Sequence, residues 1–369
     1  MNQAGRIISL EALSGRPTDT VPVGLFTWGF DYYWKAAGIE PWKLVCGGVE
    51  TWHKAHTALY ERHRPDLIFY SGAGNGTEEP TLENETSDSW FVRDNNNCNL
   101  TRLIKSSLTP QDADSGGKDC DSVGEIDSTQ TADQLVAEFT GWGSLYLQGL
   151  SRLIADLGDN ALVLPHHSPA YICACYAFGF ERAMEAMLSE PELFVYVCDR
   201  YASGDELRMR DLAEAGAQAV FIADGWASCD IISPGMFKEF ALPYQKSITE
   251  AAHKAGLKII MWNEGDILPI LSDEATVPFD AFAFEQPRKG ALITVDRVRE
   301  VFGPNRCLFG NLDSEELLGR GNVDEITRAV HEQLRQSGKN APFILNTGSP
   351  IPSNTSPEAV DAMIKAARM

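Results

Sequence analysis

The sequence has few basic residues and no long apolar segment. Its 369 residues include 31 lysines and arginines against 52 aspartates and glutamates, which gives a formal net charge of −21. Nucleic acids and anionic membranes are bound through concentrated positive charge, so this balance argues against both partners. No apolar run approaches the roughly 20 residues that a membrane-spanning helix needs. A strongly anionic small substrate is also disfavoured, because no arginine cluster offsets the acidic charge.

Signs of secretion and of disorder are also missing. The N-terminal stretch MNQAGRIISLEALSGRP has no apolar core of the kind that secretory signals carry, so we expect a cytoplasmic protein. The eight cysteines are scattered, and in that compartment we expect free thiols. With 44% hydrophobic and 22% charged residues, the composition is typical of a soluble globular protein.

Short apolar runs recur along the chain, each followed by a polar or glycine-rich end and then a helix-length amphipathic segment. Continuous apolar runs are typical of parallel strands that are covered on both faces. Eight such units predict an α/β fold, a (β/α)₈ barrel. A doubly wound sheet is the alternative, but the glycine-rich phosphate loop that it favours after the first strand is missing. The eight runs are 21–26, 66–71, 161–167, 219–225, 258–264, 281–286, 306–313 and 343–349.

The length in excess of a typical barrel falls in one segment. Residues 72–135 are rich in Asn, Asp, Ser and Gly, with only two strand-like pieces, SWFVRD and TRLIKSSL. We interpret this segment as a long insertion after the second strand that contains a hairpin. The whole chain, 1–369, is then one barrel domain with this insertion.

Two helices have clear boundary signals. Residues 233–256 have Ser233 as a predicted N-cap, Pro234 at the first helical position and Gly256 as the stop. The last helix begins in the same way, behind Ser356 and Pro357.

Barrels of this class place their catalytic groups at the carboxyl ends of the strands, so the polar residue that ends each run is a candidate. This set has two histidines and several carboxylates but no lysine or arginine, which predicts an acidic mouth. Its members are Thr27, Trp28, Ser71, His166, His167, Asp224, Asn263, Glu264, Glu285, Asn311, Asp313, Asn346, Thr347 and Ser349.

Glu264 and Glu285 follow aromatic or aliphatic neighbours where half-burial is expected. A carboxylate in such a place must be paired, metal-bound or raised in pKa, and each of these marks a functional site. With Asp224 they are our predicted catalytic residues. Asp224 and Asp313 have a structural alternative, because a strand-end aspartate can also cap the helix that follows.

Further strand-end residues are candidates for binding the substrate. His166 and His167 are adjacent, so only one of them can point into the mouth of the barrel. Aromatic residues after the first strand, including Trp28 and Tyr32, would either form a rim for an apolar ligand or simply cover the barrel. The full predicted substrate-binding set is Trp28, Tyr32, His166, His167, Asn263, Asn311 and Asn346.

Several motifs are similar to those of the uroporphyrinogen decarboxylase superfamily, which includes cobalamin-dependent methyltransferases. The similarity is carried by ISPGMFKEFALPY (232–244), by GNLD (310–313) and by TGSPIPSNTSPE (347–358). It extends well over roughly 150–369 and loosely over the N-terminal part. The resemblance also implies a (β/α)₈ barrel.

The sequence departs from the family patterns at positions that distinguish the decarboxylases from the thiol-methylating members of the superfamily. True decarboxylases have an arginine-rich segment after the first strand that grips the porphyrinogen carboxylates, whereas this chain has GLFTWGFDYYWKAAG there. The thiol-methylating members bind Zn²⁺ with a His-x-Cys segment and a later Cys. The resemblance places Trp262, Glu264 and Ser349 at those three positions.

The leading hypothesis is therefore a corrinoid-dependent methyltransferase that moves methyl from a small methylated substrate, such as an ether, to a separate corrinoid protein. Glu264 would act as a general acid or, with a histidine such as His167, bind a divalent metal such as zinc. The alternatives are a decarboxylase or lyase acting on a less anionic acid, and a barrel that binds a ligand without catalysis. Related barrels suggest a homodimer.

Overall fold

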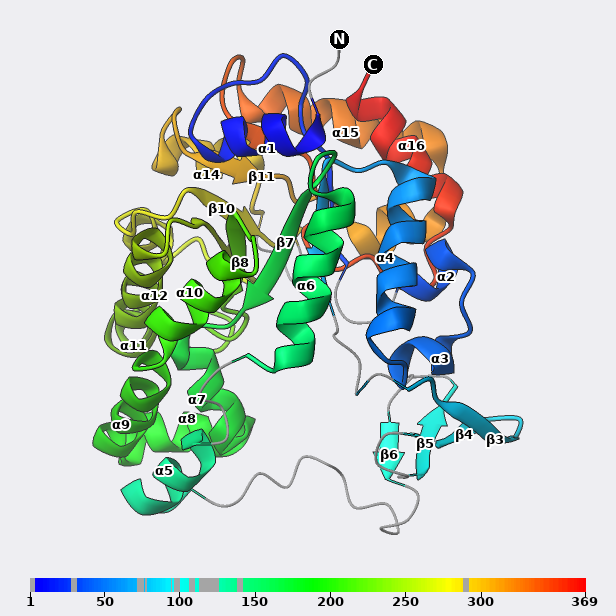
Figure 1. The fold of residues 1–369 in the computed structure, drawn as a ribbon. Helices are drawn as coiled ribbons and strands as arrows, with labels where there is room; N and C mark the ends of the chain where they lie inside the picture. The colour runs from blue at the N-terminus through cyan, green and yellow to red at the C-terminus, as the bar shows by residue number, and fades with distance from the viewer. Residues whose placement is uncertain are drawn as a thin grey trace.

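The computed structural model describes residues 4–27, 32–71, 76, 78–93, 95, 100–105, 110–112, 126–137, 142–287 and 292–369. Eight parallel strands, each at one of the predicted runs, pair in chain order. A parallel bridge between Val23 and Leu345 joins the first strand to the last, so the predicted (β/α)₈ barrel is confirmed (Figure 1). The strands are β1 (Gly24–Leu25), β2 (Leu67–Tyr70), β7 (Leu162–His167), β8 (Ala219–Ala223), β9 (Lys258–Asn263), β10 (Ala281–Phe284), β11 (Cys307–Phe309) and β12 (Phe343–Ile344).

The barrel interior is filled by alternate side chains from every strand, as closure of a small barrel requires. Four of its aromatic rings contact one another: Phe26, Phe69, Phe221 and Trp262. The rings of Phe26 and Phe69 stack with their centroids 4.9 Å apart. Helix α1 (Gly5–Leu13) closes the amino-terminal end of the barrel, since its last residues belong to the same apolar cluster.

Helices surround the strands and bury the second apolar face of each (Figure 1). Among the described residues, no helix is both long and apolar enough to cross a bilayer. The helices are α2 (Tyr33–Ala37), α3 (Pro41–Val45), α4 (Val49–His63), α5 (Thr129–Ala137), α6 (Ser144–Leu157), α7 (Ala170–Phe178), α8 (Phe180–Ser189), α9 (Pro191–Ala202), α10 (Asp205–Glu214), α11 (Pro234–Met236), α12 (Leu242–Lys254), α13 (Leu271–Glu274), α14 (Val295–Phe302), α15 (Val323–Ser337) and α16 (Pro357–Ala367), with π-helical turns η1 (Phe237–Ala241) and η2 (Ser314–Leu318).

The helix predicted over 233–256 begins and ends as expected but is interrupted. The Ser233 hydroxyl accepts a hydrogen bond from the Met236 N–H at 3.2 Å, and Gly256 adopts the left-handed conformation that ends the helix. Between α11 and α12 lies the π-helical turn η1. The cause is Pro243, which has no N–H to donate and whose ring clashes with the carbonyl four residues earlier.

The predicted hairpin in the insertion is confirmed. Strands β4 (Ser89–Arg93) and β5 (Leu100–Ile104) pair antiparallel, and with β3 (Thr81–Glu85) and β6 (Pro110–Asp112) they form a small four-stranded sheet. Val92 and Leu103 pack with Trp42 of α3 in one apolar cluster. In Figure 1 this sheet lies at the end of the barrel toward which β7 points, which is the carboxyl end of the strands.

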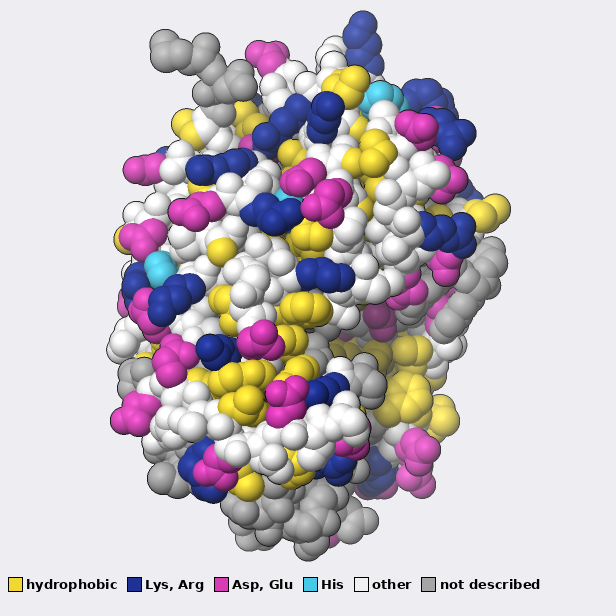
Figure 2. All heavy atoms as spheres, turned by 90° about the vertical axis from the view of Figure 1, so that its right-hand side faces the viewer, with side chains coloured by type: hydrophobic (Ala, Val, Ile, Leu, Met, Phe, Trp, Pro, Cys, Tyr) yellow, Lys and Arg dark blue, Asp and Glu magenta, His cyan; other side chains and the backbone are white. Residues whose placement is uncertain are grey.

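The outer surface mixes charges of both signs. On the face seen in Figure 2, lysine and arginine side chains are interspersed with aspartates and glutamates. Pairs such as Arg62 with Glu358, at 3.3 Å, contribute to this pattern. Exposed pairs of this kind typically stabilise a fold by less than about 1 kcal/mol.

Candidate active site at the carboxyl end of the barrel

Alternation along the strands decides which polar residues face the mouth of the barrel. On β9, Ile260 and Trp262 belong to the interior cluster, whereas Ile259 and Met261 pack against the surrounding helices. Continuing this alternation places Glu264 on the interior side and its neighbour Asn263 on the helix side.

Glu285 is a buried carboxylate on the interior side of the mouth, one residue beyond β10. It is 2% exposed, and it accepts hydrogen bonds from the Gly265 N–H at 2.9 Å and from the Ser349 hydroxyl at 3.0 Å. These two donors come from the ends of β9 and β12, so Glu285 joins loops that are far apart in the sequence. Both of its carboxyl oxygens are thereby held in place by neighbouring loops.

Glu264 is half-buried and lies beside Gly225, which follows the end of β8. A methyl group added to Gly225 would come within 3.1 Å of a Glu264 carboxyl oxygen, so the absence of a side chain at this position makes room for the carboxyl group. The backbone N–H of Glu264 is held by the Asn263 side-chain oxygen at 2.9 Å. Glu264 is therefore fixed in place by its own strand and lies close to the adjacent one.

Asp224 does not join Glu264 and Glu285 in the mouth. It is completely buried on the helix side of β8, in step with Val220 and Ile222, and it accepts a hydrogen bond from Gln245 of α12 at 2.9 Å. Its other carboxyl oxygen has no hydrogen-bond partner. Burial is the main reason that the pKa of Asp224 is raised to about 8.

A second buried acid, Glu274 of α13, lies in the same cluster. One of its oxygens accepts from Asn263 at 2.9 Å and from Gln245 at 3.3 Å, and the other has no partner. Burial raises the pKa of Glu274 to about 7. Glu274 and Gln245 are not among the residues predicted from the sequence. We call four residues the buried acid cluster: Asp224, Gln245, Asn263 and Glu274.

The two adjacent histidines point to different sides, as predicted. Nδ1 of His166 lies 3.2 Å from the carbonyl oxygen of Tyr70, and burial lowers the pKa of His166 to about 4, which keeps the ring neutral. His167 packs edge-on against Trp142, and its Nε2 atom lies 3.7 Å from Asp205. His167 therefore faces the surrounding helices, away from the interior side on which Glu264 lies.

The described residues do not form a metal site from His, Cys, Asp or Glu side chains. Within them, no three His, Cys, Asp or Glu side chains are grouped so that they could hold a metal ion. The predicted metal ligands Glu264 and His167 thus lack a third such ligand there. At the positions that the resemblance assigns to zinc ligands, Trp262 donates to the Gly348 carbonyl at 2.9 Å and Ser349 donates to Glu285. A thiolate-type zinc site does not fit these side chains.

The predicted aromatic rim is only partly within the described residues, because Trp28 lies outside them. Tyr32 is fully buried, and its hydroxyl lies 2.8 Å from Nε2 of His63, which in turn contacts Asp361 at 2.7 Å. These contacts place the Tyr32 hydroxyl against helices α4 and α16. Its role as a substrate-binding residue remains a prediction.

The predicted binding residues Asn311 and Asn346 differ in their hydrogen bonding. Asn311 donates to the carbonyls of Glu285 and Ile293 and accepts from Gln333, so it anchors the loop after β10. The side-chain oxygen of Asn346 is buried without a partner and faces Gly24. Asp313 caps the turn that follows it by accepting from two backbone N–H groups, at 2.8 and 2.9 Å, as its structural alternative predicted.

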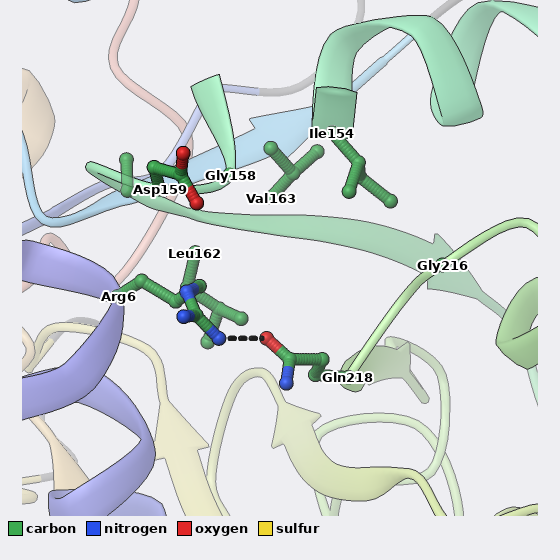
Figure 3. Close-up of a pocket in the computed structure, with 9 residues that line it drawn as sticks. Arg6, Ile154, Gly158, Asp159, Leu162, Val163, Gly216 and Gln218 are labelled. Atoms are coloured by element: carbon green, nitrogen blue, oxygen red, sulfur yellow. Dashed lines mark hydrogen bonds between the residues drawn. The ribbon is translucent and has the colours of Figure 1, made fainter. Parts of the chain in front are cut away.

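A cavity of about 230 Å³ lies at the opposite end of the barrel. It is lined by residues near the starts of β7 and β8, and its polar link is the hydrogen bond from Arg6 to Gln218 at 3.0 Å (Figure 3). Because barrels of this class carry their active sites at the carboxyl end, we assign the site to the carboxylates rather than to this cavity.

The closed ring of parallel strands, with two glutamates on the interior side of its carboxyl end, defines a (β/α)₈ barrel of the kind that carries its site in the loops after the strands. Residues 129–369, more than half of the chain, match the family described as Uroporphyrinogen decarboxylase (URO-D). The chain belongs to this family.

Individual relatives agree with this assignment. The chain is 29% identical over 130 residues to a uroporphyrinogen decarboxylase of Dichelobacter nodosus (strain VCS1703A), a match that spans 35% of this chain and 35% of that relative. A methyltransferase from Methanosarcina mazei superposes with a TM-score of 0.70 at 20% identity, over 99% of this chain and 98% of the other. A B12-independent methionine synthase from Shewanella sp. W3-18-1 gives 0.52 at 8% identity, over 95% and 98%. These identities are low, so both structures support the fold alone.

Proposed function

We propose that this protein is a methyltransferase that moves methyl from a small methylated substrate, such as an ether, to a corrinoid carried by a separate protein. The observation that carries the proposal is the pair Glu264 and Glu285 at the ends of neighbouring strands, on the interior side of the mouth. The strand-end residues around them include no lysine or arginine. Such a mouth suits a neutral substrate better than a polyanion.

An exposed group of aromatic residues beside the mouth supports the choice of acceptor. Tyr176 and Phe180 are 54% and 45% exposed, and each packs edge-on against Trp226, with ring centroids 5.0 and 5.1 Å apart. Burial raises the pKa of Tyr176 to about 12, and the charge of Glu264 adds to this rise, so this aromatic cluster lies near the proposed acid. Large exposed aromatic surfaces mark places where a partner or a flat apolar ligand docks, and this one fits the broad apolar edge of a corrin ring.

Cleavage of a methyl ether with a poor leaving group needs a proton on the departing oxygen. As the methyl–oxygen bond breaks, its electron pair stays on oxygen, and Glu264 delivers a proton there so that an alcohol or phenol leaves. Glu285 accepts from the Gly265 N–H and from the Ser349 hydroxyl, and it holds the Gly265 turn that follows Glu264. When docked, the corrinoid supplies the nucleophile that takes the methyl group.

The test combines Glu264→Gln with a series of methyl ethers whose leaving groups differ in acidity. General acids typically contribute about 10²–10⁴-fold to a rate. We expect kcat of the variant to fall by about that factor for an alkyl ether and much less for an ether that releases an acidic phenol, which needs no proton. Methyl transfer to a reduced corrinoid protein is the measurement. An equal loss across the series would exclude Glu264 as the acid.

A decarboxylase or lyase acting on a less anionic acid is the second candidate, favoured by the sequence match to a uroporphyrinogen decarboxylase. It predicts release of carbon dioxide without any corrinoid. Absence of both methyl transfer and carbon dioxide release, with Glu264→Gln and Glu285→Gln leaving the biological role intact, would instead support a ligand-binding barrel.

A further inference from the structure

The buried acid cluster is connected to the mouth of the barrel through one side chain. Asn263 donates from its amide nitrogen to Glu274 at 2.9 Å, and its oxygen accepts from the Glu264 N–H at 2.9 Å. A backbone N–H can only donate, which fixes the orientation of the Asn263 amide. Glu274, Asn263 and the backbone of Glu264 therefore form a continuous chain of hydrogen bonds from α13 to the end of β9.

We propose that Glu274 is a positioning residue: through Asn263 it holds the turn at the end of β9 that carries Glu264 and Gly265. The same turn is held from the other side, because the Gly265 N–H donates to Glu285 at 2.9 Å. The turn that carries the proposed acid is thus fixed between two carboxyl groups, one in the mouth and one in the helix layer.

The charge state of Glu274 acts on this turn. Hydrogen bonds to ionised groups are stronger than bonds to neutral ones, so loss of the Glu274 proton tightens its bond from Asn263. The raised pKa of Glu274, about 7, places this change near neutral pH. The groups that face the two acids of the cluster are Gln245 on α12, Asn263 and Glu264 at the end of β9, and Asp273 on α13, which pairs with Lys238 of η1 at 3.3 Å.

Hydrogen exchange of the Glu264 amide, read by mass spectrometry with residue-level fragmentation, tests the proposal without any substrate. In the wild type we expect protection of this amide, corrected for base catalysis of exchange, to rise as pH increases through 7. Glu274→Gln keeps an oxygen for Asn263 but cannot titrate, so its protection should not depend on pH. Glu274→Ala removes the acceptor, and the amide should exchange at least tenfold faster at every pH.

Asp273→Asn is the matched control, because it removes a carboxylate one residue away that faces Lys238 and not Asn263. It should keep a pH-dependent protection like that of the wild type, with the rise moved to lower pH, because the charge of Asp273 contributes to the raised pKa of Glu274. Amides in the middle of β8 serve as an internal reference for global destabilisation, and they should exchange equally in all variants. Wild-type protection in Glu274→Ala, or an unchanged pH response in Glu274→Gln, would overturn the proposal.

The consequence for catalysis rests on the proposed function, whereas the exchange experiment does not. If Glu264 is the acid, Glu274→Ala should lower kcat for methyl transfer and leave KM for the donor unchanged. Altered exchange without any methyl transfer in the wild type would reject the proposed function and keep the positioning role of Glu274. Unaltered exchange together with normal methyl transfer would reject the positioning role of Glu274 and keep the proposed function.

Discussion

At the scale of single residues, Asp224 is an acid in an unusual environment. Its carboxyl is fully buried, one oxygen is bonded to Gln245, and the other has no partner. A charged carboxylate would be costly in such surroundings, and a neutral acid costs much less. Because burial raises its pKa to about 8, Asp224 keeps its proton at neutral pH.

This proton makes stability depend on pH in a defined direction. Between the ordinary pKa of 3.8 and the folded value of about 8, the folded carboxyl holds a proton that the unfolded chain has released. The free energy of unfolding therefore falls as pH rises, by about 1.4 kcal/mol per pH unit for one proton. Asp224→Asn cannot titrate, so its stability should decline less steeply across this window.

Urea unfolding at steps between about pH 5 and about pH 7.5 measures this slope. The slope is a better readout than absolute stability, because the asparagine leaves its own N–H groups partly unsatisfied. Asp273→Asn is the control, since it removes a neighbouring carboxylate that is paired near the surface with Lys238. Identical slopes for the wild type and Asp224→Asn would contradict the raised pKa of Asp224.

At the scale of elements, the turn after β9 depends on one glycine. The backbone of Gly265 has φ of +68°, a conformation that is strained for a residue with a side chain. A methyl group added there would also collide with the side chains of Ser228 and Asp230. Gly265→Ala should therefore cost about 1 kcal/mol for the backbone and about 1–3 kcal/mol more for the contact, and it should displace Glu264.

Gly256→Ala separates the two contributions. Gly256 has a similar φ of +80°, but nothing lies within 4 Å of a methyl group added there. It should cost only the backbone component, about 1 kcal/mol, and leave activity unchanged. Chemical denaturation of both variants gives the difference between their free energies of unfolding. Equal losses of stability in the two variants would mean that the contact with Ser228 and Asp230 is not tight.

The strands could be predicted because each is apolar on both faces. For the same reason, the sequence does not show which face of a strand is turned toward the barrel interior and which toward the helices. Val220 and Phe221 are equally apolar and equally buried, although one packs against helices and the other fills the barrel. The sequence therefore predicts Asp224 beside Glu264 and Glu285, whereas the structure places it on the helix side. Only the register of the closed barrel separates the two sets.

Other parts of the site gave weaker signals in the sequence. Glu274, in the stretch LSDE, resembles a surface acid, and its burial follows from the way α13 packs over the end of β9. Gln245 lies within an amphipathic helix, where a glutamine gives no signal of burial or of a functional role. The π-helical turn before Pro243 was foreseeable, because proline within a helical pattern disrupts the preceding turn.

At the scale of the whole molecule, the aromatic cluster of Tyr176, Phe180 and Trp226 gives the proposed function a surface test. Phe180→Ala should raise KM for the corrinoid protein several-fold and leave kcat unchanged, because it removes docking area and no catalytic group. Leu188→Ala is the control, since this residue of the same helix is 75% exposed. Steady-state methyl transfer at varied concentration of the corrinoid protein gives KM and kcat for both variants. An equal change of KM in Phe180→Ala and Leu188→Ala would argue against docking at the cluster.

The closed sheet also has a consequence for how the chain acquires its fold during synthesis. Strand β1 is made before the other strands of the barrel, yet one of its neighbours, β12, is made after them. The Gly24 N–H donates to the Leu345 carbonyl and the Leu345 N–H donates to the Pro22 carbonyl, so these bonds join residues more than three hundred positions apart. Until then one edge of β1 has no partner. Contacts this distant form slowly, because the entropy of closing so long a loop must be overcome first. A nascent chain therefore carries an unpaired strand edge for most of its translation, and this is where chaperones would act.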